Sequence, residues 1–278
     1  MHMTTTRTPE KAAQIERFVR LYERNQSDLV RGIERRVCGC DYGGTSWSTR
    51  AEADRLAQLL KLQPGRHLLE VGAGSGWPGL YMARTSQCDV TLTDLHPGSL
   101  AMASRRAARD RVEGQSGIHR FAVAEGGALP FPAASFDAIV HSDVLCCLAD
   151  KAAVLSACRR VIGKDGSMAF TVILTAPGLR GDDLTRAIDA GPGYITTDTE
   201  YPEMVRQAGW EIDRIEDFSP QYAETLTRML AEEAAHGDEL ATMFGEADLA
   251  DRLAKRQIGI DTIENGLLRR ELFFVRPG

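Results

Sequence analysis

Short apolar segments alternate with amphipathic ones through the middle of the chain, and this pattern predicts an α/β fold. Runs rich in β-forming residues predict strands at 67–72, 89–94, 119–124, 136–141 and 168–174. Apolar residues at helical spacing predict helices between these strands, at 77–85, 97–112 and 150–162. Strands and helices that alternate in this way form a parallel sheet with helices on both faces.

The chain before this region is predicted to be helical. Apolar positions recur at helical spacing from about 9 to 36. A loop dense in Gly and Ser follows at 38–48, and either Ser48 or Thr49 can cap the helix after it.

The chain after this region begins with an irregular stretch. Pro and Gly residues at 177–193 predict a long connection without regular structure, followed by a helix near 200–208 and a strand at 210–218. A polar helical region from 220 to about 265 precedes a last strand at 267–275. Because this region separates the last two strands, we interpret it as an insert over one end of the sheet.

Composition and charge limit the classes of partner. The chain has 278 residues, 43% hydrophobic and 26% charged, with a net charge of −6. This acidity argues against a nucleic-acid partner, and we interpret the arginines between 105 and 111 as a solvated helix face. The six cysteines have no metal-binding spacing, so we expect no metal and a cytoplasmic location with reduced thiols. No apolar run approaches the ~20 residues of a membrane span.

The first predicted strand of the α/β region runs into a glycine-rich turn. Residues 68–76 read Leu-Leu-Glu-Val-Gly-Ala-Gly-Ser-Gly. Glycines at 72, 74 and 76 let a ligand approach the backbone closely, and the helix that follows offers free N–H groups to a carboxylate or phosphate.

Two cofactor classes compete for this turn. Residues 74–79 satisfy the Gly-x-Gly-x-x-Gly fingerprint of nicotinamide-dependent oxidoreductases. Residues 70–76 satisfy the acidic-x-Gly-x-Gly-x-Gly pattern of methyltransferases. The second interpretation is favoured because the strand ends at Val71, so the first glycine of the turn should be Gly72, and the dinucleotide register begins two residues later. In addition, Pro78 removes a backbone donor, and Glu70 suits a cationic sulfonium cofactor but would repel a diphosphate.

The second predicted strand ends in an acid, Asp94, 18 residues beyond Gly76. A carboxylate at this position can accept both hydroxyls of a ribose. A strand-terminal Asp is also a common helix cap. After such a glycine turn, we predict ribose binding.

The region from about 66 to 176 resembles a class I S-adenosylmethionine-dependent methyltransferase of the small-molecule type. The resemblance rests on the glycine turn with Asp94, and on three further segments: 125–131 (Glu-Gly-Gly-Ala-Leu-Pro-Phe), similar to the family's Asp-Ala-x-x-Leu-Pro-Phe, 135–140 (Ser-Phe-Asp-Ala-Ile-Val) and 160–166 (Arg-Val-Ile-Gly-Lys-Asp-Gly).

This resemblance implies a Rossmann-like, seven-stranded, mostly parallel sheet with helices on both faces. We expect an N-terminal helical lid or extension at 1–50 and a methyltransferase core at 51–278, with a helical insert at about 219–265 before the last strand. The implied cofactor is S-adenosyl-L-methionine, and the implied reaction is methyl transfer to oxygen, nitrogen or carbon of a small molecule.

The resemblance also implies which residues bind the cofactor: Glu70, Gly72, Ala73, Gly74, Gly76, Asp94, Leu95, Glu125, Gly126, His141 and Trp47. Two departures stand out. The family usually has Asp where Glu125 would contact the adenine amino group, and Gly126 lacks the usual apolar packing under the adenine. Many relatives have His at Cys147, so no histidine-based role is assigned there.

The catalytic candidates follow the fourth strand, which ends in His141-Ser142-Asp143. Because ligands of open α/β sheets bind beyond the carboxyl ends of the strands, these residues would lie beside the reacting methyl group. A hydroxyl acceptor needs a base, and His141 or Asp143 could serve. Tyr222 in the helical insert is the third catalytic candidate, because it could project into the acceptor pocket, although a tyrosine there would be equally at home in the core. Tyr42 and Trp47 in the loop are possible walls of this pocket, and anchoring of the loop would explain either aromatic at least as well.

Other functions stay open at this point. A non-catalytic S-adenosylmethionine-binding protein and a nicotinamide-dependent oxidoreductase are the two alternatives. A nucleic-acid methyltransferase is disfavoured by the acidity and by the lack of an Asn/Asp-Pro-Pro-aromatic segment after the fourth strand.

Overall fold

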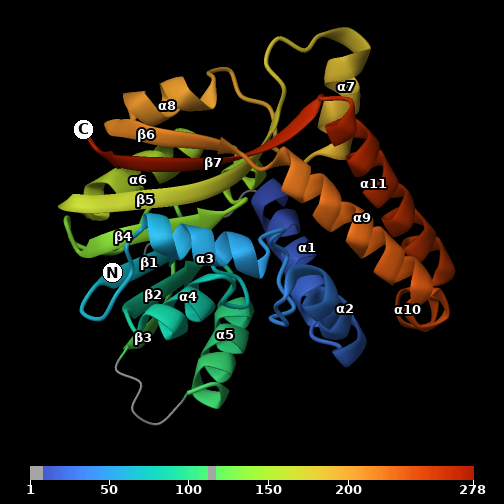
Figure 1. Ribbon diagram of the computed structural model, residues 1–278, viewed down its shortest axis with the longest axis horizontal. Helices are drawn as coiled ribbons and strands as arrows, with labels where there is room; N and C mark the ends of the chain where they lie inside the picture. Colours follow the sequence, from blue (N-terminus) through green and yellow to red (C-terminus); the bar gives the residue numbers. More distant parts are fainter. Residues whose placement is uncertain (1–8, 112–116) are drawn as a thin grey trace.

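A seven-stranded sheet with the strand order β3-β2-β1-β4-β5-β7-β6 forms the centre of the molecule (Figure 1). The computed structural model describes residues 9–111 and 117–278, with side chains from residue 16 onward. The strands are β1 His67–Val71, β2 Asp89–Asp94, β3 His119–Val123, β4 Phe136–Ser142, β5 Ile162–Thr175, β6 Trp210–Asp217 and β7 Leu268–Pro277. β7 runs antiparallel to β5 and β6, and the other pairs are parallel. The predicted fold class is confirmed.

Helices cover both faces of this sheet (Figure 1). They are α1 Pro9–Asn25, α2 Asp28–Cys38, α3 Arg50–Leu59, α4 Gly79–Ser86, α5 Pro97–Arg109, the 3₁₀ helix η1 Leu145–Cys147, α6 Lys151–Val161, α7 Gly181–Ala190, α8 Tyr201–Gln207, α9 Ser219–Ala235, α10 Gly237–Phe244 and α11 Glu246–Glu264. One hydrophobic cluster lies between the sheet and α3, α4 and α5, and a second lies between the sheet and α6 and α8. Successive residues of β1, Leu68 and Leu69, belong to opposite clusters, which explains why the strand is apolar throughout.

Local signals set several helix ends. Thr49 caps α3 in a reciprocal capping box, in which its hydroxyl accepts from the Glu52 N–H and the Glu52 carboxylate accepts from the Thr49 N–H. Ser27 caps α2. This cap divides the helical stretch predicted at 9–36 into α1 and α2.

Two predictions of secondary structure were wrong. The connection at 177–193 contains the helix α7, whose apolar residues were outweighed by the surrounding Pro and Gly. β5 begins at Ile162, inside the predicted helix 150–162. Residue 112 of the predicted helix 97–112 and residues 1–8 of the predicted extension lie outside the described residues.

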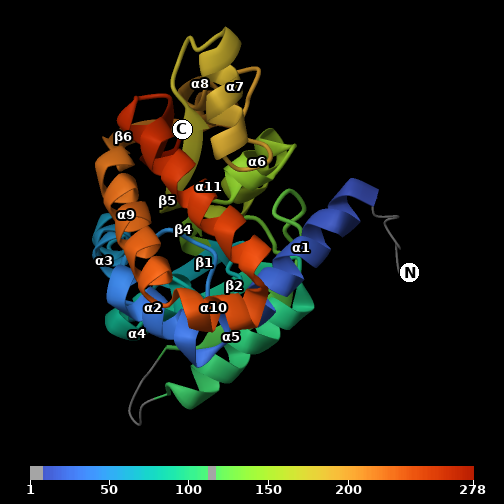
Figure 2. The same cartoon turned by 90° about the vertical axis from the view of Figure 1, so that its right-hand side faces the viewer.

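The helical insert is confirmed as α9, α10 and α11, between β6 and β7. Figure 2 shows these helices gathered with α1 and α2 at one end of the sheet. This is the end at which the parallel strands terminate, so the flanking segments enclose the edge where ligands of such sheets bind. Within the described residues, no helix has the length and apolarity needed to cross a membrane.

Candidate functional site

The turn between β1 and α4 has a backbone that only glycine adopts easily. Gly72, Gly74 and Gly76 have φ angles of 71°, 52° and 99°. A Cβ atom at Gly72 would lie 2.6 Å from Val144 Cγ2, and one at Gly74 would lie 2.2 Å from the Tyr22 hydroxyl oxygen. The turn is therefore in close contact with the segment after β4 and with α1, which are distant in sequence.

Asp94 joins the end of β2 to this turn. Its carboxylate accepts hydrogen bonds from the backbone N–H of Gly74 and of His96, each at 2.8 Å. Burial raises the pKa of Asp94, and the two backbone hydrogen bonds oppose that rise. The structure thus places Asp94 beside the turn, as expected, and its contact with a ribose stays a prediction.

Glu70 lies behind the turn. Its two carboxylate oxygens accept from the Gly79 N–H at 3.1 and 3.2 Å, at the start of α4. Burial raises the pKa of Glu70 to about 8. Glu70 therefore fixes the first turn of α4, and its predicted interaction with the cofactor stays a prediction.

The segments predicted to surround the adenine lie beyond β2 and β3. Leu95 is half-buried and Glu125 is exposed. A Cβ atom at Gly126 would lie 3.2 Å from Val71 Cγ1 and 3.3 Å from Val154 Cγ2. Gly126 is thus packed against valines of β1 and α6, and the predicted contacts of Leu95, Glu125 and Gly126 with the cofactor stay predictions.

Tyr22 is a site residue that the sequence analysis missed. Its hydroxyl lies over the glycine turn and 3.3 Å from Thr45 Oγ1. Burial, with the nearby Asp94 carboxylate, raises the pKa of Tyr22. In the sequence it is one apolar position on a helix, and no local signal distinguishes it from the others.

The loop at 41–48 is fastened to the helices around it. Glu34 on α2 accepts from the Gly43 N–H at 2.7 Å, and Arg106 on α5 donates to the Asp41 carbonyl at 2.6 Å and to its carboxylate. The Arg106 guanidinium also lies 3.8 Å from the centre of the Tyr42 ring. The interpretation of these arginines as a solvated helix face was therefore wrong for Arg106, which anchors the loop.

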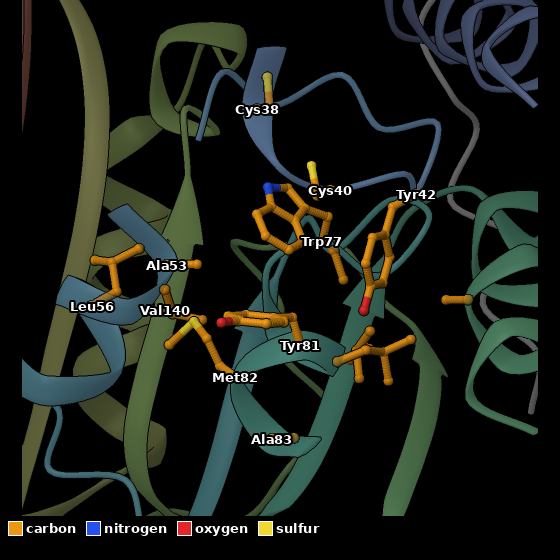
Figure 3. Packing of buried hydrophobic residues seen from close by; sticks show 14 of the residues in the cluster. Cys38, Cys40, Tyr42, Ala53, Leu56, Trp77, Tyr81, Met82, Ala83 and Val140 are labelled. Atoms are coloured by element: carbon orange, nitrogen blue, oxygen red, sulfur yellow. The ribbon is translucent and has the colours of Figure 1, made fainter. Parts of the chain in front are cut away.

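Aromatic packing holds the same loop to α4. The Tyr42 ring lies 5.2 Å from Trp77, and Trp77 lies 5.4 Å from Tyr81 (Figure 3). The Trp77 indole N–H donates to the Ser48 carbonyl at 2.8 Å. The loop is therefore part of the hydrophobic cluster that also contains Ala73 of the glycine turn.

His141 is enclosed near the end of β4. Its ring stacks on Phe170 at 4.6 Å, and neither ring nitrogen has a hydrogen-bond partner in the described part of the chain. Burial lowers its pKa to about 3, so the imidazole is neutral at pH 7. Its roles as general base and cofactor contact stay predictions that this position does not favour.

Asp143 follows β4 with a left-handed φ of 55°. Its Oδ1 accepts from Arg270 Nε at 2.9 Å, whereas its Oδ2 is buried without a partner among the described residues. Arg270 on β7 is fully buried and also donates to both carboxylate oxygens of Glu52, at 3.0 and 3.1 Å. Burial opposes the charge on Arg270, but the two carboxylates outweigh it and raise its pKa.

Tyr222 and Trp47 meet beside this ionic network. Their rings lie 5.7 Å apart, and the Arg270 guanidinium lies 5.8 Å from the Tyr222 ring. On the other side, Arg256 of α11 lies 4.6 Å from the Trp47 ring. The structure therefore brings Asp143, Tyr222 and Trp47 together, and their roles toward an acceptor or the cofactor stay predictions.

The left-handed glycines and Asp94 form a cradle that suits a nucleoside cofactor, and the nearby Ser75 hydroxyl is buried without a partner among the described residues. A comparison with protein families matches residues 69–170 to a methyltransferase domain, and this segment contains the whole cradle. The chain therefore contains a methyltransferase domain, at residues 69–170.

The chain is similar to proteins that are named for different acceptor molecules. It is 31% identical over 176 residues to 27-O-demethylrifamycin SV methyltransferase of Amycolatopsis mediterranei (strain S699), covering 62% of this chain and 64% of the relative. It is 28% identical over 194 residues to phosphoethanolamine N-methyltransferase of Triticum aestivum, covering 69% and 37%. Each match thus spans less than two thirds of the relative.

Solved structures share the fold. Phosphoethanolamine N-methyltransferase 2 of Haemonchus contortus has a TM-score of 0.75 at 16% identity, covering 94% of this chain and 60% of that one. The [4+2]-cyclase SpnF has a TM-score of 0.70 at 21% identity, covering 97% and 96%. Because one of these proteins is named a cyclase, the fold alone does not specify the reaction of this protein.

Proposed function

We propose that this protein transfers the methyl group of S-adenosylmethionine to a small-molecule acceptor at oxygen, nitrogen or carbon. The observation that carries the proposal is the cradle at the carboxyl ends of β1 and β2. There, Asp94 is fixed against Gly74 and can exchange its backbone hydrogen bonds for those of a ribose.

S-adenosylmethionine, when bound, supplies a methyl group already activated by its sulfonium. The protein's residues then have to align the acceptor and exclude water. Gly72, Gly74 and Gly76 allow the backbone to approach the cofactor. Tyr22 and the loop at 41–48 cover the turn, in keeping with a lid at 1–50, and Asp143 faces the acceptor.

A small acceptor in the cytoplasm fits the remaining observations. The net charge of −6 disfavours a nucleic acid as the methyl acceptor. All six cysteines lie in the described part of the chain as free thiols, which suits a reducing compartment. The two named relatives act on a rifamycin derivative and on phosphoethanolamine, and neither of these is a macromolecule.

The test is a calorimetric titration with S-adenosylhomocysteine. Asp94→Ala should weaken binding about tenfold or more, the loss expected for a charge-assisted hydrogen bond, and Asp94→Asn should weaken it less. Asp89→Ala, at the opposite end of β2, is the control. Unchanged binding by Asp94→Ala would refute the cradle, and tighter binding of NADH would favour an oxidoreductase. Formation of S-adenosylhomocysteine in a metabolite extract distinguishes catalysis from binding alone.

A further inference from the structure

A continuous line of contacts leads from the glycine turn to the helical insert. Gly72 touches Val144, and the preceding residue, Asp143, is paired with Arg270. Arg270 lies over the ring of Tyr222, which in turn contacts Trp47. This line joins the turn that would hold the cofactor to the helical insert, so its side chains are the candidates for contact with an acceptor.

The inner part of this line carries excess negative charge. We call Glu52, Arg270 and Asp143 the inner triad. It contains two carboxylates and one guanidinium, joined by hydrogen bonds of 2.9 to 3.1 Å. Asp143 Oδ2 is buried and receives no hydrogen bond from any described residue. Because a buried carboxylate oxygen without a donor is unfavourable, this atom is suited to an N–H or O–H group of a ligand.

The outer part carries excess positive charge. We call Arg252, Glu233 and Arg256 the outer triad. Glu233 is buried, and its carboxylate lies 2.6 Å from Arg252 but 3.4 Å from Arg256. The Arg256 side chain is only 17% exposed, and burial lowers its pKa. Arg256 donates from Nε and Nη2 to the two Glu233 oxygens, each at 3.4 Å, so its Nη1 retains donors for an anion.

We propose that the acceptor is a small molecule that is polar at both ends, with an N–H or O–H nucleophile received by Asp143 and an anionic group received by Arg256. The inference rests on the proposed function and narrows its choice of acceptor atom. A carbon nucleophile without N–H or O–H would leave Asp143 Oδ2 unpaired.

The chemistry of the two triads explains this preference. A carboxylate attracts an amine or hydroxyl donor and orients the lone pair of that group. As this lone pair bonds to the methyl carbon, the carbon–sulfur bond of the sulfonium would break to leave S-adenosylhomocysteine, and the N–H or O–H proton would pass to the carboxylate or to water. A guanidinium matches the paired oxygens of a carboxylate, sulfonate or phosphate. The Tyr222 and Trp47 rings between the triads supply apolar surface for the carbon chain that joins the two ends.

Arg270 is the positioning residue of the inner triad. Its Nε holds Asp143 Oδ1, which leaves Oδ2 for the acceptor, and its backbone N–H donates to Ser219 Oγ at 3.1 Å. It thereby fixes the start of α9, the helix that carries Tyr222, relative to Asp143.

The test compares matched pairs of acceptors at saturating S-adenosylmethionine. The anionic probes are 3-aminopropanoate, O-phosphoethanolamine and 3-hydroxybenzoate, and their neutral-ended partners are propylamine, ethanolamine and phenol. We expect methylation of at least one anionic probe with kcat/KM about tenfold or more above its partner. Arg256→Gln should reduce this ratio of kcat/KM values to about one, and Arg256→Lys should restore part of it. The exposed Lys255→Gln on the same helix is the control for charge.

S-adenosylhomocysteine binding should be the same in Arg256→Gln and the native protein. A large loss of that binding would assign Arg256 to the cofactor's carboxylate and overturn the proposal. Methylation of no probe, equal methylation of both members of every pair, or a ratio that survives Arg256→Gln would also overturn it. Failure of the native protein to bind S-adenosylhomocysteine would instead refute the proposed function.

Discussion

Glu70→Gln provides a quantitative test of how the glycine turn is held. The Glu70 carboxyl is 1% exposed, and its hydrogen bonds come from one backbone N–H, that of Gly79. The amide of glutamine has the same shape and can still accept from Gly79. The substitution therefore removes the titration while retaining the contact.

The size of the effect follows from the pKa of Glu70. Burial raises this pKa from 4.5 to about 8 in the folded protein. Between these values the folded state retains a proton that the unfolded state has lost, so stability falls as the pH rises. At about 1.4 kcal/mol for each pKa unit, the native protein should lose about 5 kcal/mol at most between pH 4.5 and 8 through this group.

The assay is urea unfolding of both proteins at about pH 5 and about pH 8. Other buried groups titrate equally in the two proteins, so the difference between their pH dependences isolates Glu70. Between the two pH values, the free energy of unfolding of Glu70→Gln should fall by several kcal/mol less than that of the native protein. Glu239→Gln, at an exposed position on α10, should follow the native profile. Parallel profiles for Glu70→Gln and the native protein would refute the reasoning.

Two further substitutions probe the packing around the site. Gly74→Ala adds a Cβ 2.2 Å from the Tyr22 hydroxyl at a φ of 52°. We expect urea unfolding to show a free energy of unfolding lower by about 1–3 kcal/mol, and Tyr22→Phe should recover part of this loss. Equal losses in both backgrounds would contradict the clash. Arg270→Met leaves Asp143 and Glu52 buried without their cation, so it should lower the free energy of unfolding by about 3–5 kcal/mol, and Glu52→Gln should restore part of this. A methionine variant as stable as the native protein would show that the two carboxylates are not charged together.

Hydropathy predicted the fold, and the family resemblance rested on the glycine turn, Asp94 and three further segments. A parallel strand has to be apolar on both faces, and a close approach between backbone and ligand requires glycine. Both requirements are local, so β1, the turn at 72–76 and Asp94 could be identified from the sequence. The helix α7 was missed because its flanking Pro and Gly residues have the composition of a loop.

Tertiary structure alone decided which polar side chains meet at the acceptor end. Arg270 lies among three charged residues near the start of β7 and Glu52 lies in a capping box, and neither position indicates a buried ionic network with Asp143. Tyr22 is placed over Gly74 only by the packing of α1. His141 was a candidate base in the sequence, yet the structure buries it on β4 with its ring stacked on Phe170 of the neighbouring strand β5.

The sequence by itself thus determined the sheet, the glycine turn and the cofactor class, because these depend on patterns within short segments. The three-dimensional structure decided the charges around Tyr222 and Trp47, because they come from α3, β4, β7, α9 and α11. Contacts between segments so far apart depend on how the whole chain packs, and no local pattern encodes them.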